Sequence, residues 1–440
     1  GLVWPEMLPF RSLSLFSSSI SMTDSSLFKA KKVSALKNGG ALWWVGAQDI
    51  DTRDFHGYGI EGTTYGAYLL QTEDEVVLID TVKAKFADEF MERISSIVKP
   101  EQITKLIVQH TEPDHGSALP AVLPKLPNAT VICTDKVQKM MKALYHIEPE
   151  CQIVGHDEEV TVGTKTLKFG KVPMLHWPDS SYTYLKEDKV LFSNDAFGQH
   201  FPGDDLFCDH HDRSHVSREM QSYTANIIGP FIGPKGSMEK GLGKVVATTE
   251  GDIDMICPSH GVIFRTPEDI KMALDLYVSY TKNSHIRPKV LVLYDSMYGT
   301  TSKIARAIEQ GVVDAGAEVK LVNTRASDLE RVATEAFDCA CVAVGSPTIN
   351  ATVMPSIHAA LGYLKGLGLL KKKPAAAFGS YGWAPTNVKE ITSMLTGCKA
   401  EVIEGHKVNQ MWAPAGDIFQ RAQELGAELG RQALEKAKKE

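Results

Sequence analysis

Four imidazole and carboxylate side chains fall within six residues of the segment LIVQHTEPDHG. They are His110, Glu112, Asp114 and His115, and they follow an apolar run that predicts a buried strand. Because alternate residues of an extended segment point to one side, His110, Glu112 and Asp114 can converge while the residues between them face away. Such side chains are common metal ligands, so this spacing indicates a metal site, with a solvated turn as the alternative.

Three more candidate ligands stand where predicted strands meet their loops. His176 follows the run TLKFGKVPML, Asp195 ends KVLFSND, and His260 follows IDMICPS. The set contains no thiolate, and mixed imidazole and carboxylate ligation suits iron or manganese better than zinc. Six or seven ligands accommodate two ions more naturally than one, and Asp195 is the candidate bridge between them.

A second candidate site is the turn in YDSMYGTTSKIA, between a predicted strand and a predicted helix. Backbone N–H groups and the positive helix end make such a turn an anion cradle, to which hydroxyls add donors. It lacks the Walker lysine and the G-x-G-x-x-G spacing, so a monophosphate is favoured over ATP or NAD. An ordinary capped helix is the alternative. The turn comprises Ser296, Met297, Tyr298, Gly299, Thr300 and Thr301.

Two later strand ends belong to the same side of the predicted sheet, where open α/β sheets bind ligands. Tyr381 and Trp383 offer flat surfaces to an aromatic ring, and polar backbone lies beside them. The layout is similar to that of flavodoxin, which binds FMN. The candidate residues from these two segments are Pro347, Thr348, Ile349, Asn350, Ala351, Ser380, Tyr381, Gly382 and Trp383.

The elements that must position these sites fall into two domains, as a length of 440 residues suggests. Residues 25–286 contain short strand runs and helical patterns such as 84–98, which predict sheets with helices outside them. Residues 287–440 alternate strands and helices more regularly, which predicts a doubly wound parallel sheet. Its five predicted strands are VLVLYDS, EVKLVNT, CACVAVGSP, PAAAFGSYG and AEVIEGHKVN.

Composition excludes several classes of function. The hydrophobic and charged fractions, 43% and 23%, are those of a soluble globular protein. A net charge of −7 without a basic stripe disfavours nucleic acid, and no apolar run reaches the roughly 18 residues of a membrane span. Seven cysteines without C-x-x-C spacing favour a reducing compartment, and the cytoplasm is expected. Residues 1–24 are expected to be a disordered leader or cloning extension, with an organellar transit peptide as the weaker alternative.

The H-x-E-x-D-H segment, with His176, Asp195 and His260, resembles the flavodiiron proteins, also called A-type flavoproteins. Hydrolases of the metallo-β-lactamase fold carry H-x-H-x-D-H, and Glu112 in place of the second histidine is the family's mark of iron and redox work. The resemblance covers the chain after residue 25. It implies an α/β chain with a metallo-β-lactamase-like αββα domain, followed by a flavodoxin-like doubly wound parallel-sheet domain.

The resemblance also implies the cofactors, FMN and two non-haem irons. It leaves His115 open between a metal ligand and a neighbour of the ligands. For the pocket beyond the ligands we consider functional roles for His56, Tyr58, Trp177 and His200, with structural packing as the alternative. The implied ligands are His110, Glu112 and His176 for one iron, Asp114 and His260 for the other, and Asp195 as the bridge.

The implied reaction is the reduction of dioxygen to water, with four electrons relayed through FMN to the diiron centre, an oxygen-detoxifying form of electron transport. Reduction of nitric oxide to nitrous oxide, or of both gases, is the alternative. The resemblance implies a separate electron donor, rubredoxin-like or a flavin reductase, and a head-to-tail homodimer or dimer of dimers. Rival hypotheses are a zinc hydrolase with an added flavin domain and an electron carrier with a vestigial metal domain. The histidine-rich run CDHHDRSH is expected to be an exposed loop.

Overall fold

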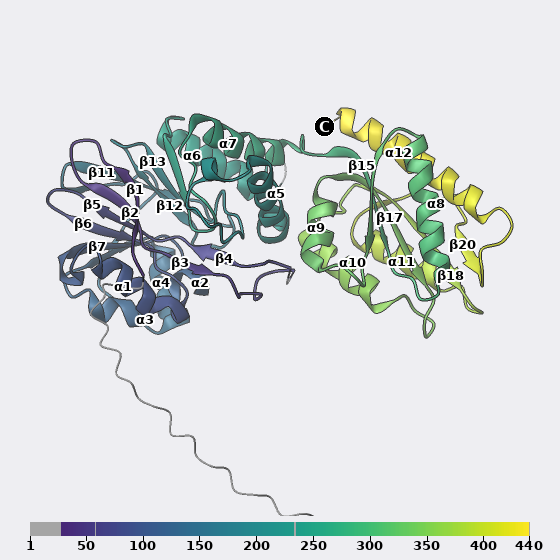
Figure 1. Cartoon of the computed structure of the whole chain (residues 1–440), viewed down its shortest axis with the longest axis horizontal. Coiled ribbons are helices and arrows are strands. Elements are labelled where there is room, and N and C mark those ends of the chain that lie inside the picture. The colour runs from purple at the N-terminus through teal and green to yellow at the C-terminus, as the bar shows by residue number, and fades with distance from the viewer. Residues whose placement is uncertain (1–27, 58, 233–234, 440) are drawn as a thin grey trace, which may run out of the picture.

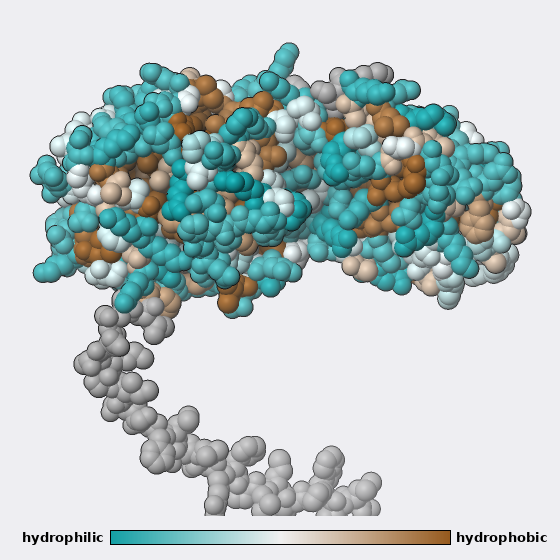
Figure 2. Space-filling model, turned by 45° about the horizontal axis from the view of Figure 1, so that its top comes forward, coloured by the Kyte–Doolittle hydropathy of each residue, from teal (hydrophilic) through white to brown (hydrophobic). Residues whose placement is uncertain are grey.

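The computed structural model describes residues 28–57, 59–232 and 235–439. The predicted leader, residues 1–24, and the pocket candidate Tyr58 lie outside these ranges. Two domains follow one another along the chain (Figure 1). Among the described residues, no helix combines the length and the apolar character that crossing a bilayer requires. Figure 2 shows hydrophilic residues over most of the visible face, with hydrophobic residues in separate small groups.

The first domain contains two sheets that pack face to face. In the seven-stranded sheet, neighbours are antiparallel from β1 to β6 and parallel from β6 to β9. Its strands, in spatial order, are β1 (Lys31–Ala35), β2 (Ala41–Trp44), β5 (Tyr68–Gln71), β6 (Val76–Ile79), β7 (Ile103–Val108), β8 (Thr130–Cys133) and β9 (Cys151–Ile153).

The second sheet has five strands, of which only the last pair, β13 and β14, is parallel. The strands are β10 (Glu159–Val162), β11 (Lys165–Lys171), β12 (Ser181–Leu185), β13 (Val190–Asn194) and β14 (Met255–Pro258). A separate pair joins β3 (Ala47–Asp49) to β4 (Thr63–Tyr65). Val77 and Ile107 of the first sheet and Leu167 and Phe192 of the second belong to one buried cluster between the sheets. This apolar contact holds the sandwich together.

Helices cover both outer faces of the sandwich, which gives four layers (Figure 1). Three of these helices begin at polar side chains that cap them, at Thr134, Asp212 and Thr266. In α4, for example, the Thr134 hydroxyl accepts a hydrogen bond from the Val137 N–H. The first sheet carries α1 (Ala87–Ser95), α3 (Leu119–Val122) and α4 (Asp135–Tyr145), and the second carries α5 (Arg213–Tyr223), α6 (Ser237–Thr249) and α7 (Pro267–Lys282).

The second domain begins at β15 and is a parallel sheet in the order β16-β15-β17-β18-β19, with β20 also paired to β18. Helices lie on both faces, so this is the predicted doubly wound arrangement. Its elements are β15 (Arg287–Tyr294), α8 (Thr300–Asp314), β16 (Glu318–Asn323), α9 (Leu329–Phe337), β17 (Cys339–Pro347), α10 (Pro355–Leu367), β18 (Pro374–Tyr381), α11 (Asn387–Gly397), β19 (Glu401–Val402), β20 (Asn409–Met411) and α12 (Ile418–Lys439).

The fifth predicted strand of this domain differs from the structure. The run AEVIEGHKVN, residues 400–409, is divided between β19 and β20. β19 pairs with the beginning of β18 and β20 pairs with its end. Between them, Gly405 has a φ of +99°, which interrupts the extended backbone.

Candidate functional site

The segment from His110 to His115 changes conformation halfway along. β7 ends at Val108, and a short helix, α2 (Pro113–Gly116), follows with Pro113 at its first position. His110 and Glu112 therefore lie on extended chain, whereas Asp114 and His115 lie in a helical turn. Alternation along an extended segment allowed all three residues to converge, whereas the family resemblance implied that Asp114 belongs to a different iron from His110 and Glu112. The helical turn directs Asp114 to a second, neighbouring group of ligands.

All seven predicted metal ligands come together in two groups, each with its ligand atoms within 4.8 Å of one another. The strand-end positions of Asp195 and His260 bring the second sheet to the same place as the loop after β7. No other such group occurs among the described residues. The first group is His110, Glu112, His176 and Asp195, and the second is Asp114, His115 and His260.

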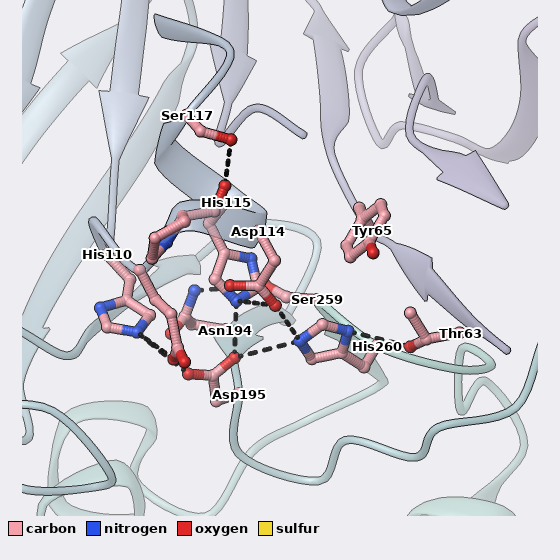
Figure 3. A network of polar contacts seen from close by, with 12 residues as sticks. Thr63, Tyr65, His110, Asp114, His115, Ser117, Asn194, Asp195, Ser259 and His260 are labelled. Atoms are coloured by element: carbon pink, nitrogen blue, oxygen red, sulfur yellow. Dashed lines mark hydrogen bonds and ion pairs between the residues drawn. The ribbon is translucent and has the colours of Figure 1, made fainter. Parts of the chain in front are cut away.

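Asp195 lies between the two groups (Figure 3). Its Oδ2 is 3.3 Å from His110 Nε2 and 3.4 Å from His176 Nε2. Its Oδ1 is 3.0 Å from His115 Nε2 and 3.6 Å from His260 Nε2. Each carboxylate oxygen thus faces a different group, which is the arrangement that a bridging ligand needs.

The atoms that converge here fit metal ions better than they fit one another. Both oxygens of Asp195, Oδ1 of Asp114 and both ring nitrogens of His115 are buried, yet none forms a hydrogen bond of good geometry with any described residue. Buried carboxylates without hydrogen bonds are costly unless a cation compensates them. Carboxylate and imidazole donors in two groups that share Asp195 suit two ions of the iron type.

The carboxylates of the two groups change the pKa values of the neighbouring histidines. Burial alone would lower the pKa of His115, but the charges of Asp114 and Asp195 outweigh it and raise that pKa to about 9. Burial likewise opposes a raised pKa at His176, where Asp195 and Glu112 prevail and bring it to about 9. Without metal, both rings therefore hold a proton at neutral pH, and metal ions must displace it.

Hydrogen bonds on the far side of the rings fix their orientation. Asp179 Oδ1 is 3.0 Å from His110 Nδ1, and Asp179 Oδ2 accepts hydrogen bonds from the N–H and hydroxyl of Thr111 at 2.9 and 2.6 Å. His260 Nδ1 donates to the backbone carbonyl of Thr64 at 2.7 Å. Each Nε2 is thereby directed at the carboxylates. Asp179 was not among the predicted site residues, although it follows His176 by only three residues in the same loop.

A cavity of about 270 Å³ opens beside Glu112 and Asp114, and His56 and Phe55 line it. Of the other predicted pocket residues, Trp177 packs edge-on against the His110 ring at 5.3 Å. His200 is buried, and its Nδ1 is 2.9 Å from the hydroxyl oxygen of Thr63.

Tyr223 is a buried neighbour of the second metal group that no sequence pattern indicated. Its ring lies 4.9 Å from that of His200 and 5.8 Å from that of His260. Burial, reinforced by the charge of Asp195, raises its pKa well above the usual value. Tyr223 is the last residue of α5, and no spacing in the sequence links it to a ligand.

The histidine-rich run CDHHDRSH forms no metal-ligand group in the described part of the chain. His210 is half exposed and its Nδ1 pairs with Asp205 Oδ2 at 2.9 Å. The neighbouring Asp209 accepts two hydrogen bonds from Arg265, at 2.8 and 2.9 Å. These contacts are ordinary surface ion pairs.

The predicted phosphate turn lies between β15 and α8, as expected. The Ser296 hydroxyl oxygen accepts from the N–H groups of Gly299 and Ser302 at 3.1 and 3.3 Å. Gly299 has a φ of +89°, and a Cβ built on it would meet no atom within 4 Å, so open space lies over the start of the helix. The turn is thus shaped as an accessible anion cradle.

The other two predicted segments adjoin this turn. The hydroxyls of Thr301 and Ser380 are 2.8 Å apart, and the Thr348 N–H donates to the Ser380 carbonyl at 2.9 Å. The Thr348 hydroxyl is buried without a hydrogen-bond partner among the described residues, so it is available to a ligand. Tyr298 and Trp383 are 92% and 87% exposed, so both rings are accessible for stacking on a ligand.

Trp412 joins the same edge of the sheet, although it was not among the predicted site residues. Its backbone N–H donates to the Tyr381 carbonyl at 2.9 Å, and its backbone carbonyl accepts from the Thr300 hydroxyl at 3.1 Å. Its ring centre lies 6.4 Å from that of Trp383. Pairing of β20 with β18 brings it there, which the expected single strand did not reveal.

Comparisons with known proteins agree with this geometry. The family model described as ODP family beta lactamase matches residues 64–261, and the flavodoxin model matches residues 292–433. The chain is 37% identical to the nitric oxide reductase of Moorella thermoacetica over 88% of this chain and 96% of that protein. It is 38% identical to the rubredoxin-oxygen oxidoreductase of Megalodesulfovibrio gigas, over 80% and 87%. The crystal structure of the flavodiiron protein from Giardia intestinalis superposes with a TM-score of 0.86 at 38% identity, covering 90% of this chain and 96% of that one.

Proposed function

This chain belongs to the flavodiiron proteins, and we propose that it reduces dioxygen to water, with reduction of nitric oxide to nitrous oxide as the second candidate activity. The family and fold predictions are confirmed. The observation that carries the proposal is the pair of ligand groups that share Asp195 in a chain that also has a flavodoxin domain. The preference for dioxygen and the role of each site residue are part of the proposal.

The cofactors are FMN and two irons, and the residues present suit both. We assign His110, Glu112 and His176 to one iron and Asp114, His115 and His260 to the other, with Asp195 as the bridge. This assignment makes His115 a ligand, which the sequence left open. When bound, FMN would supply the electrons, and two irons held by these residues would supply the site for reduction of the gas. Reduction of dioxygen to two waters takes four electrons and four protons, and reduction of two nitric oxide molecules takes two of each.

The surrounding residues prepare the site for this chemistry. Asp179 fixes the His110 ring, and Trp177 covers one side of that ring. His56 lies at the cavity beside Glu112 and Asp114, where an imidazole can donate or accept a proton. Partial burial is the main reason why the pKa of His56 is lowered, which favours the neutral ring.

Two features support the proposed partners. Figure 1 places α2, which carries Asp114 and His115, in the first domain, and the flavin-binding edge at β18 and β20 in the second. This separation within one chain supports a head-to-tail homodimer, or a dimer of such dimers, in which the flavin of one chain faces the metal site of the other. The name of the Megalodesulfovibrio relative supports a rubredoxin-like donor, with a flavin reductase as the alternative.

Stopped-flow mixing tests the proposal. The FMN- and iron-loaded protein is reduced without oxygen and mixed with dissolved dioxygen or nitric oxide, while flavin absorbance is followed. Fast reoxidation by dioxygen is expected, and it should be lost in Asp195→Ala but kept in His210→Ala, which alters a histidine outside both groups. Faster turnover of nitric oxide would favour the second candidate. Equal, slow reoxidation of the wild type and Asp195→Ala by both gases would contradict both.

Metal analysis separates the proposal from the zinc-hydrolase hypothesis. Glu112, with its Oε2 3.1 Å from His176 Nε2, supplies a carboxylate where a hydrolase of this fold would supply a third imidazole. Iron in near-stoichiometric amount is therefore expected in protein purified without added metal. Zinc in both groups, together with hydrolytic activity, would contradict the proposal.

A further inference from the structure

The loop between β3 and β4 connects the metal cavity with the second domain of the same chain. We call residues 54–57 and 59–61 of this loop the cavity loop. In Figure 1 the connection between β3 and β4 extends from the first domain towards α9. The cavity loop therefore has two contact regions, one at the metal site and one at α9.

At the metal site, the cavity loop contacts both the ligands and the cavity. The Phe55 ring lies 4.4 Å from the His200 ring and 5.9 Å from the His260 ring. His56 lines the 270 Å³ cavity together with Glu112 and Asp114. A shift of the cavity loop would therefore change the walls of the space next to the metal groups.

At the other region, the backbone of the cavity loop lies directly on the first turn of α9. A Cβ built on Gly57 would lie 2.7 Å from the Glu330 backbone nitrogen, and Gly57 has a φ of +81°. A Cβ built on Gly59 would lie 2.6 Å from Asp328 Cγ and 2.9 Å from Glu330 Cβ. Such distances leave no room for a side chain, so close contact between the loop and the helix requires glycine at both positions.

Glu330 is itself held from the first domain. The Ser222 hydroxyl of α5 donates to Glu330 Oε1 at 2.8 Å, and the Asn226 side chain donates to the Glu330 backbone carbonyl at 3.3 Å. Gly59, His200 and Glu330 also line one cavity of about 600 Å³ between the domains. The Gly59 backbone N–H also faces the Glu330 carboxylate, so the Glu330 side chain is fixed between α5 and the cavity loop.

We propose that Glu330 is a positioning residue for the metal cavity, acting through Gly57 and Gly59 on the placement of Phe55 and His56. The proposal deepens the proposed function by giving the second domain a role at the metal site of its own chain. It rests on that function only for the kinetic part of its test. The structural part, the restraint on the cavity loop, can be measured whatever gas the protein reduces.

Hydrogen exchange followed by mass spectrometry tests the restraint in the full-length protein loaded with FMN and iron. Glu330→Ala is expected to raise exchange in peptides covering residues 54–57 and 59–61 by about tenfold, the effect of losing one hydrogen bond to a charged group. Glu330→Gln keeps an acceptor for Ser222 and should restore slow exchange. The KM for dioxygen should change more in Glu330→Ala than kcat does, with iron and FMN contents unchanged.

Gln221→Ala is the matched control. The Gln221 side chain donates from α5 to the Thr334 backbone carbonyl of α9 at 3.4 Å, in the same interface but not to Glu330. Exchange in the loop should stay slow in this variant. Unchanged exchange in Glu330→Ala, or equally fast exchange in Gln221→Ala, would overturn the proposal.

Gly59→Ala probes the same contact from the loop side and serves if Glu330→Ala does not fold. Its added methyl group meets α9, and faster exchange in the cavity loop is expected again. Unchanged exchange would overturn the positioning role while leaving the proposed function intact. A wild type that reduces neither gas, with exchange behaving as expected, would instead overturn the proposed function alone.

Discussion

Asp179 holds the His110 ring from the side away from the metal groups: its Oδ1 lies 3.0 Å from Nδ1, while Nε2 of the same ring lies 3.3 Å from Asp195 Oδ2. A carboxylate in this position fixes the tautomer of a metal-binding imidazole and increases its basicity. The contact is fully buried, so water does not replace it.

Asp179→Asn should therefore weaken iron binding without removing a ligand. An amide keeps the shape but loses the charge, and a loss of about 10- to 100-fold in iron affinity is expected. Competition with a chelator measures it. Asp205→Asn, which alters a similar contact to His210 at the surface, is the control and should bind iron normally. Equal affinity in both variants would contradict the role given to Asp179.

Asp195→Ala should empty both metal positions, because each of its oxygens faces a different group. His260→Ala removes a residue of the second group only and is expected to retain iron in the first. Elemental analysis of the purified variants, with flavin content as the check on folding, distinguishes the two. Full iron occupancy in Asp195→Ala would show that this carboxylate does not bridge.

Trp412→Ala should weaken FMN binding, because the Trp412 ring lies beside Trp383 at the edge of the sheet that carries the phosphate turn. Loss of one aromatic contact predicts an increase in the Kd for FMN of about three- to tenfold. Titration of the flavin-free protein with FMN measures it. Phe419→Ala, at an exposed aromatic residue of α12, is the control. An unchanged Kd in Trp412→Ala would place the flavin elsewhere.

Because of Glu330, the stability of the folded protein should depend on pH. Burial raises its pKa to about 7; the Ser222 hydrogen bond opposes this, and the charges of Asp328 and Glu219 add to it. A carboxyl with a higher pKa in the folded state binds more protons there, so stability falls as pH rises from about 4.5 to about 7. Above that range the charge costs about 1–3 kcal/mol, allowing for partial exposure.

Glu330→Gln removes this charge. Its melting temperature should exceed that of the wild type at pH 8 by a few degrees, with little difference at pH 5. Thermal unfolding of both proteins at the two pH values measures the effect. A gain of the same size at both pH values would show that the charge of Glu330 is not the cause.

The ligand positions could be predicted because strand ends are visible in the sequence. Apolar runs located β7, β13 and β14, and His110, Asp195 and His260 stand at or just beyond their ends. Asp179 and Tyr223 could not be found this way, since their roles depend on how a loop and a helix end pack against the ligands. Their spacing in the sequence carries no such information.

In the second domain, too, only part of the structure could be predicted from the sequence. Alternating strand and helix patterns predicted the parallel sheet and the phosphate turn before α8. The division of residues 400–409 between β19 and β20 was not predicted, because a short polar strand has no apolar run. Trp412 was missed for that reason: it reaches the edge of the sheet that carries the predicted phosphate turn only because β20 returns to pair with β18.

Each metal group draws residues from both sheets of the sandwich. His110 and Glu112 follow β7 of the seven-stranded sheet, whereas His176 and Asp195 come from the five-stranded one, and the second group is divided in the same way. Bound ions would therefore cross-link the two halves of the first domain, as a disulfide cross-links a small protein. The metal-free protein should therefore begin to unfold at the contact between the two sheets. If the chain were cut between the sheets, either metal group could form again only after the two fragments had reassembled.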